Sequence, residues 1–228
     1  MLAPLAVGAG AAAQAVTGIG FALVCAPFLV AAEGGREGVR LAILLSALLN
    51  TVMVARERRH VRPSFVVLLL VPAALATPVF AVVVRRLPED VLAGVAGAVI
   101  LLAVAALAVG LRVRRAEGRG GAIVAGVVSA GMNVASGVGG PPVALYAVNA
   151  GWPPRTARAS LQAYFLCLNV VALIGLGLPA LRPGLLVAMA VGWAAGTLLD
   201  RFVPDSWATA AVLTIAGIGG VVALVSSM

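Results

Sequence analysis

Eight apolar segments, separated by short charged breaks, account for nearly all of this sequence of 228 residues. A helix needs about 20 apolar residues to cross the hydrocarbon core of a bilayer, and most of the segments come close to that length. The chain is 62% hydrophobic and 11% charged, whereas a soluble domain is about 25% charged. The sequence therefore predicts an all-α, multi-pass protein of the cell membrane, folded as one membrane domain over residues 1–228. The segments cover residues 3–32, 39–55, 65–84, 91–111, 121–150, 159–178, 185–199 and 207–226.

The positive charge of the chain fits the same interpretation. The net charge is +8, and every basic residue is an arginine that lies in or beside a break. Arginine-rich short loops are typical of the cytoplasmic side of membrane proteins, so we expect the lipid bilayer as a partner and no nucleic acid. The lone histidine, His60, and the two cysteines, Cys25 and Cys167, have no partners nearby in sequence. We therefore expect no metal site, no cofactor and no enzymatic activity.

The first and fifth apolar segments are too long for one ordinary span, and each is interrupted in its middle. The first contains Thr17, Gly18 and Gly20, with Pro27 further on, and the fifth contains the run Gly-Val-Gly-Gly-Pro-Pro at residues 137–142. Proline lacks the amide donor of a helix, and glycine costs about 1 kcal/mol relative to alanine. Unwound backbone at membrane depth is tolerated only inside the protein or facing a water-filled cavity. We expect a broken helix in each segment.

The two interrupted segments also match each other. At an offset of 119 residues, polar and glycine positions coincide, which predicts an internal repeat with halves at residues 1–115 and 120–228. Paired Gly- or Pro-interrupted segments at corresponding positions of two halves point to the binding site of a transporter. The coinciding positions are Gln14 with Asn133, Thr17 with Ser136, Gly18 with Gly137, Gly20 with Gly139, Arg36 with Arg155, and Asn50 with Asn169.

Two topologies are open at this point. If all eight segments cross the membrane, the halves are parallel and the arginines divide nine to seven between the two sides. If the first and fifth segments are hairpins that return to their own side, the halves are inverted and the arginines divide eleven to five. Because cytoplasmic loops carry an excess of arginine, the uneven division favours the inverted repeat.

The broken helices suggest a site for a small anion. A half-helix N-terminus has unpaired N–H groups and a partial positive charge, and glycines let an anion approach them closely. Polar side chains around the breaks, and an arginine near the second one, would add donors. Purely structural roles are the alternatives. The glycines would then serve close helix packing, and Thr17 and Ser136 would bond to the backbone of their own helices. Arg158 would extend its charged end to the membrane surface. The predicted substrate-binding residues are Gln14, Thr17, Gly18, Gly20, Asn50, Asn133, Ser136, Gly137, Gly139, Gly140, Arg158 and Asn169.

The second half also resembles a known family. The run at residues 133–146, followed by residues 152–155 and 158–161, is similar to the second signature of the TauE/SafE sulfite exporter family. The first half carries a weaker copy at residues 17–27, in which Phe21 stands where the second copy has Gly140. The resemblance covers essentially the whole chain and implies a multi-pass transporter of small sulfur-containing or organic anions.

These observations together predict a secondary transporter that exports a small anion, such as sulfite, a sulfonate or a related sulfur or organic anion. The alternatives are an anion channel and a membrane scaffold or subunit that transports nothing, and oligomerisation is left open. No Asp or Glu falls inside an apolar segment, although proton-coupled carriers usually keep a titratable relay within the membrane. We therefore expect the membrane potential alone to drive export, which is worth about 2.3 kcal/mol per charge per 100 mV.

Overall fold

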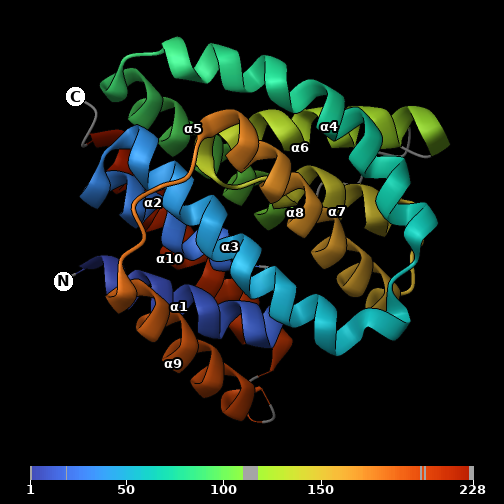
Figure 1. Ribbon diagram of the computed structural model, residues 1–228. Helices are drawn as coiled ribbons and strands as arrows, with labels where there is room; N and C mark the ends of the chain where they lie inside the picture. Colours follow the sequence, from blue (N-terminus) through green and yellow to red (C-terminus); the bar gives the residue numbers. More distant parts are fainter. Residues whose placement is uncertain (1, 19, 110–117, 201, 203, 226–228) are drawn as a thin grey trace.

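A computed structural model describes residues 2–18, 20–109, 118–200, 202 and 204–225, and these residues form ten α-helices and one short 3-10 helix (Figure 1). Ile19, most of the predicted loop at 112–119, and Arg201 lie outside the described residues. The helices are α1 (Leu2–Thr17), α2 (Phe21–Glu33), α3 (Gly35–Glu57), η1 (Arg58–His60), α4 (Pro63–Arg86), α5 (Glu89–Ala108), α6 (Gly118–Ser136), α7 (Gly140–Asn149), α8 (Pro154–Leu176), α9 (Pro183–Leu199) and α10 (Asp205–Val225).

The predicted all-helical membrane fold is confirmed. Within the described residues, four helices are long and apolar enough to cross a bilayer, namely α3 with η1, α4, α5 and α8. The lipid-facing surface is clearest on α4, where Val67, Val71, Leu75 and Val79 are all more than half exposed. Their spacing of four residues places them on one face of the helix. Such an apolar stripe is stable against acyl chains and not against water.

Both interrupted segments consist of two helices, as predicted, and the first break falls at residues 18–20, while Pro27 lies inside α2. Two other boundaries differ from expectation. The predicted breaks at residues 33–40 and 151–158 are mostly helical, because α3 begins at Gly35 and α8 at Pro154. Glycine or proline before a charged first turn starts a helix even where hydropathy is low.

The two helix pairs form hairpins that open toward opposite ends of the bundle. Leu2 at the start of α1 and Glu33 at the end of α2 line one surface pocket together. On the other hairpin, the Tyr146 hydroxyl of α7 donates to the carbonyl of Gly118, where α6 begins, at 3.2 Å. Helix α3 leaves the first hairpin, and its last residues meet the first turns of α8, which leaves the second hairpin.

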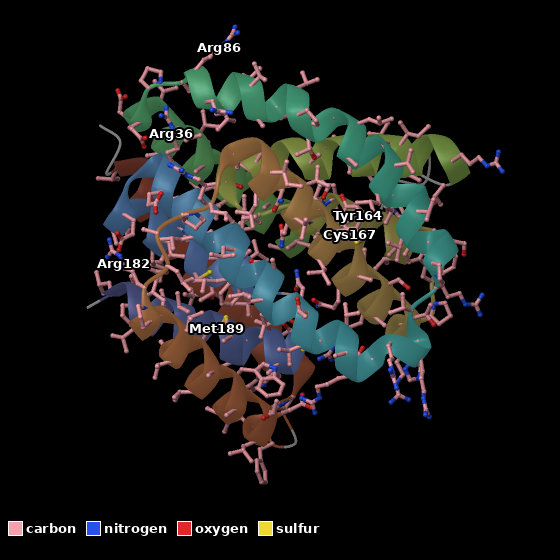
Figure 2. All side chains as sticks on the ribbon, in the orientation of Figure 1. Arg36, Arg86, Tyr164, Cys167, Arg182 and Met189 are labelled. Carbon is pink, nitrogen blue, oxygen red and sulfur yellow. The ribbon has the colours of Figure 1, made fainter. Side chains whose placement is uncertain are left out.

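We name the two ends of the bundle after arginines that lie there. The Arg36 end holds the open side of the α1–α2 hairpin, and the Arg158 end holds that of the α6–α7 hairpin. Opposed hairpins are the arrangement expected for inverted halves, and the repeat itself stays a prediction. Arginines described at the Arg36 end are Arg36, Arg40, Arg85, Arg86 and Arg182, three of which are labelled in Figure 2, and those at the Arg158 end are Arg56, Arg58, Arg59, Arg62, Arg119, Arg155 and Arg158.

Helices from the two sequence halves pack against one another in pairs: α1 with α9, α4 with α6, α3 with α8, and α5 with α10. Small residues make the closest of these contacts. A Cβ added to Gly192 or Gly196 of α9 would collide with the backbone of Gly8 or Ala12 on α1. Without a hydrophobic driving force between helices in lipid, such close backbone approach is a main source of association.

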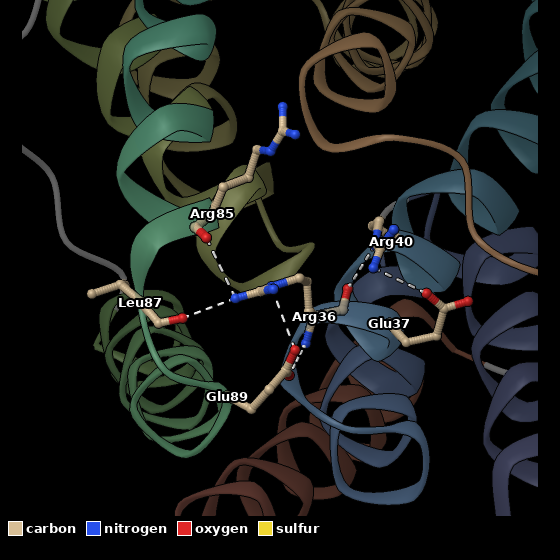
Figure 3. A network of polar contacts seen from close by, with 6 residues as sticks. All are labelled: Arg36, Glu37, Arg40, Arg85, Leu87 and Glu89. Atoms are coloured by element: carbon tan, nitrogen blue, oxygen red, sulfur yellow. Dashed lines mark hydrogen bonds and ion pairs between the residues drawn. The ribbon is translucent and has the colours of Figure 1, made fainter.

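Polar contacts close the Arg36 end (Figure 3). The Arg36 backbone N–H donates to Glu89 Oε2 at 2.8 Å, and its guanidinium Nη2 donates to the Leu87 carbonyl at 2.9 Å. One turn further along α3, Arg40 pairs with Glu37 at 3.3 Å. Glu37 also accepts the Ala180 N–H at 2.8 Å. These contacts tie the start of α3 to the α4–α5 turn and to the segment between α8 and α9.

Candidate functional site

A cavity of about 60 Å³ lies between the two helix breaks. Residues 20–23 line it from the first break, residues 137–141 line it from the second, and α3 and α8 supply further side chains. One buried water needs roughly 10–15 Å³ on this measure, so the cavity has room for a few waters or one small polyatomic ion.

Most of the predicted site residues meet at this cavity. Those that line it are Gln14, Gly20, Asn50, Asn133, Gly137, Gly139, Gly140 and Asn169, and those that do not are Thr17, Gly18, Ser136 and Arg158. The four amide side chains come from four different helices, α1, α3, α6 and α8. Each is 5% exposed or less. Burial of so many amides in a membrane protein is costly unless they have partners or a ligand.

The first break directs the N-terminus of α2 at the cavity. Gly18 has a φ of +77° and Gly20 a φ of +154°, conformations that side chains with a Cβ rarely adopt. The Phe21 N–H donates to Gln14 Oε1 at 3.1 Å, and no side chain of the capping residue Gly20 blocks the helix start. The next two residues, Ala22 and Leu23, also line the cavity. Their N–H groups belong to the first turn, which has no intrahelical acceptors.

The second break is held by hydroxyl groups. Gly137 ends α6 with a φ of +74°. The Ser129 hydroxyl donates to the Gly139 carbonyl at 2.6 Å, and the Tyr164 hydroxyl donates to Ser129 at 2.9 Å. Helix α7 then begins with Gly140, Pro141 and Pro142. Because two of these residues have no N–H, α7 contributes its dipole but fewer donors than α2.

Two neighbouring polar side chains on α3 line the cavity. The Ser46 hydroxyl is buried and makes no hydrogen bond among the described residues, and Ser46 is 8% exposed. One turn later, Asn50 is 4% exposed. On the opposite wall, Asn133 Nδ2 donates to Asn169 Oδ1 at 3.0 Å. Sequence reasoning missed Ser46, although its spacing of four from Asn50 places both on one helix face.

Thr17 and Ser136 satisfy their hydroxyl donors on their own helices. Thr17 Oγ1 donates to the Ala13 carbonyl and Ser136 Oγ donates to the Met132 carbonyl, both at 2.8 Å. Ser136 Oγ also accepts the Val138 N–H at 3.3 Å. These bonds are the alternative that the sequence left open for the two residues. They stabilise the helix ends beside the cavity.

Arg158 lies outside the cavity, toward the Arg158 end. Its Nη2 donates to the Ala15 carbonyl at 3.1 Å, and its Nε lies 3.7 Å from Glu57 Oε1. One turn along α8, Gln162 stands between Arg158 and the cavity. Gln162 accepts from Gln14 Nε2 at 3.1 Å and donates to the Gly18 carbonyl. The two glutamines therefore seal the cavity on this side.

The cavity is a neutral site whose mainly apolar walls carry four amide side chains and one hydroxyl. None of the described residues that line it is charged, and the described residues include no cluster of three metal-ligating side chains. Toward the Arg36 end the second break lies close to α3, where a Cβ added to Gly137 would approach Ala42 Cβ to 3.0 Å. An anion in this space would be held by amides, a hydroxyl and helix N-termini, without a counter-charge.

Comparison with known proteins gives one match. The model of the family described as sulfite exporter TauE/SafE matches residues 2–223. No curated protein and no solved structure matches the chain.

Proposed function

Because this chain belongs to the TauE/SafE sulfite exporter family, and is therefore a multi-pass membrane transporter, we propose that it exports sulfite or a related small sulfur oxyanion through the cavity between the two helix breaks. The observation that carries the proposal is Ser46, a cavity-lining residue whose buried hydroxyl has no protein partner among the described residues, one turn from the buried amide of Asn50. An unsatisfied hydroxyl beside several amides in one cavity fits a ligand that supplies acceptors.

The chemistry of the cavity fits an oxyanion. The oxygens of such an ion would accept from the Ser46 hydroxyl, the amides of Asn50 and Asn169, and the N–H groups at the start of α2. Charge-assisted hydrogen bonds of this kind are roughly twice as strong as neutral ones. The small volume favours an ion the size of sulfite over a large organic acid. Sites in which half-helices point at anionic groups recur in secondary transporters.

Orientation and mode of transport follow from the same features. The arginine excess lies at the Arg158 end, so the positive-inside rule places that end in the cytoplasm. Toward that end Gln14 bonds to Gln162 beside the cavity. Two broken helices that meet at one cavity support a carrier that opens alternately, in preference to a channel.

Replacing Ser46 by alanine or Asn50 by leucine should weaken sulfite transport strongly while the protein stays folded. Each change removes one hydrogen bond to a charged ligand, worth about 1.5–3 kcal/mol, which corresponds to a rise in KM of roughly 10- to 100-fold. Uptake of labelled sulfite into proteoliposomes measures the effect. Thr51→Val is a matched control, because the Thr51 hydroxyl bonds to its own helix at Ala47 and its side chain is exposed. Equal KM values for the three variants would contradict the proposed site.

The rate of transport should also depend on the membrane potential. Because the anion crosses without a compensating charge, transport toward the positive side should be faster than transport toward the negative side. No described side chain at the cavity carries a charge that could move with the substrate or neutralise it. A potential of 100 mV is worth about 2.3 kcal/mol per charge, or roughly fiftyfold accumulation. Proteoliposomes with a potassium gradient and valinomycin set the potential for this measurement. Flux that does not change when the gradient is reversed would rule out potential-driven export and point to a neutralising co-substrate.

A further inference from the structure

A second, larger pocket of about 320 Å³ opens at the Arg158 end, beyond the glutamine seal. It lies where α3 and α9 end and α8 begins, and we call it the vestibule. Its polar lining is provided by Arg56, Glu57, Arg158, Trp193, Thr197 and Asp200. None of these residues except Arg158 is indicated by the sequence motifs, and none of them lines the cavity.

Several polar groups of the vestibule are buried without hydrogen-bond partners. Arg158 Nε and Trp193 Nε1 are both N–H donors, and neither makes a hydrogen bond among the described residues. Glu57 Oε2 is a buried acceptor that likewise makes no hydrogen bond among the described residues. The Arg56 guanidinium lies 5.0 Å from the centre of the Trp193 ring, which adds positive charge beside the indole. Two orphan donors and two arginines can bind acceptor oxygens here, beside the carboxylates of Glu57 and Asp200 in the same lining.

We propose that the vestibule is a second oxyanion site, in which Arg158 and Trp193 bind the anion before it passes to the cavity. The guanidinium supplies the charge and the Nε–H, and the indole supplies a second fixed donor. The inference rests on the proposed function in that its ligand is the transported anion. It adds Trp193, Arg56 and Glu57 to the transport path, and it makes Arg158 a residue of the vestibule.

Glu57 acts as an internal competitor at this site. Its carboxylate lies 3.7 Å from Arg158 Nε, too far for a hydrogen bond but close enough for an ion pair. An incoming oxyanion would take this place on the guanidinium, because it can accept from both Arg158 and Trp193. The vestibule therefore binds its ligand weakly, as expected of a site from which the ligand passes to the cavity.

The connection to the cavity runs along α1 and α8. Ala15, whose carbonyl accepts from Arg158, lines the vestibule, and the adjacent Gln14 lines the cavity. Gln162 follows Arg158 by one helical turn and bonds to Gln14. Parting of the two glutamines would join the vestibule to the cavity at the first break.

Trp193 allows binding at the vestibule to be measured apart from transport. In the double variant W152F/W207F, Trp193 is the remaining tryptophan of the chain, and its fluorescence is followed while purified protein in nanodiscs is titrated with sulfate or sulfite at constant ionic strength in chloride. We expect a saturable change. In this background Arg158→Gln should weaken binding at least tenfold, and Glu57→Gln should tighten it several-fold. Arg155→Gln, an exposed arginine of the same helix outside the vestibule, is the matched control.

The outcomes separate this inference from the proposed function. A saturable signal that persists in Ser46→Ala, while transport by that variant falls, supports two distinct sites. No Trp193 signal in a preparation that transports sulfite overturns the vestibule site and leaves the cavity standing. A signal in a preparation that transports none of the tested anions supports the vestibule site and removes the proposed function. If Arg158→Gln does not fold, a Glu57→Gln protein that binds no tighter than its parent overturns the inference.

Discussion

Gly139→Leu should abolish anion transport, with a loss of at least tenfold and a protein that still inserts in the membrane. A Cβ at Gly139 would lie 2.9 Å from both the Ser129 carbonyl oxygen and Asn133 Cβ, so even the first atom of the new side chain displaces the second break. The displaced groups include the amide that bonds to Asn169 across the cavity. In enzyme sites a misplacement of about 1 Å costs on the order of a hundredfold. Sulfite flux in proteoliposomes, corrected for protein amount, measures the loss.

The matched control for this change is Gly120→Leu. Gly120 lies at the start of α6, is exposed, and has no atom within 4 Å of an added Cβ. It should transport at the parental rate. Parental flux in the Gly139 variant would show that the second break does not shape the substrate path, and the cavity between the breaks would lose its proposed role.

Gly192→Leu should destabilise the whole membrane domain. An added Cβ at Gly192 collides with the carbonyl group of Gly8, and backbone atoms cannot move aside as a flexible side chain can. Overpacking in a well-packed core costs about 1–3 kcal/mol, and a clash with helix backbone belongs at the upper limit of that range or above it. The contact joins α1 to α9, one of the closely packed helix pairs of the bundle. We expect a drop in Tm of several degrees or a failure to accumulate in the membrane, measured by fluorescence-detected size exclusion after heating.

Gly184→Leu on the same helix separates packing from helix propensity. Both substitutions replace a glycine of α9 by a good helix former, but an added Cβ at Gly184 meets nothing within 4 Å. The Gly184 variant should be as stable as its parent or slightly more stable. Equal Tm values for the two variants would mean that α1 and α9 do not pack as closely as their glycines indicate.

The helices and the two breaks were predictable because each depends on local chemistry. Hydropathy marks the segments whatever their neighbours, and a run of glycines and prolines cannot continue a helix. Gly18 and Gly137, which end α1 and α6 with positive φ, were correctly placed at the breaks on this ground. The amides Asn50 and Asn169 were found by the offset of 119 residues, and both line the cavity.

The residues that the sequence did not reveal are those that differ between the two halves. At the same offset Ser46 corresponds to Phe165, Gln162 to Ile43, and Glu57 to Leu176. Comparison of the halves finds only what they share, so it cannot indicate a polar group present once. The roles of these residues depend on tertiary contacts: Ser46 on the cavity, Gln162 on Gln14, and Glu57 on Arg158. The asymmetry gives the bundle the Gln14–Gln162 bond and the Glu57–Arg158 ion pair.

The contacts around Arg36 have a kinetic consequence. If the anion leaves at that end, the bonds from α3 to the α4–α5 turn and to the segment before α9 must part and re-form in every cycle. Exposed ion pairs such as Arg36 with Glu89 contribute about 0–1 kcal/mol each, and salt on the outer side screens them further. These contacts are therefore strong enough together to stabilise the resting conformation, and each is weak enough to be broken by thermal motion. Stronger, buried pairs at the same positions would hold this end of the bundle together through the whole cycle.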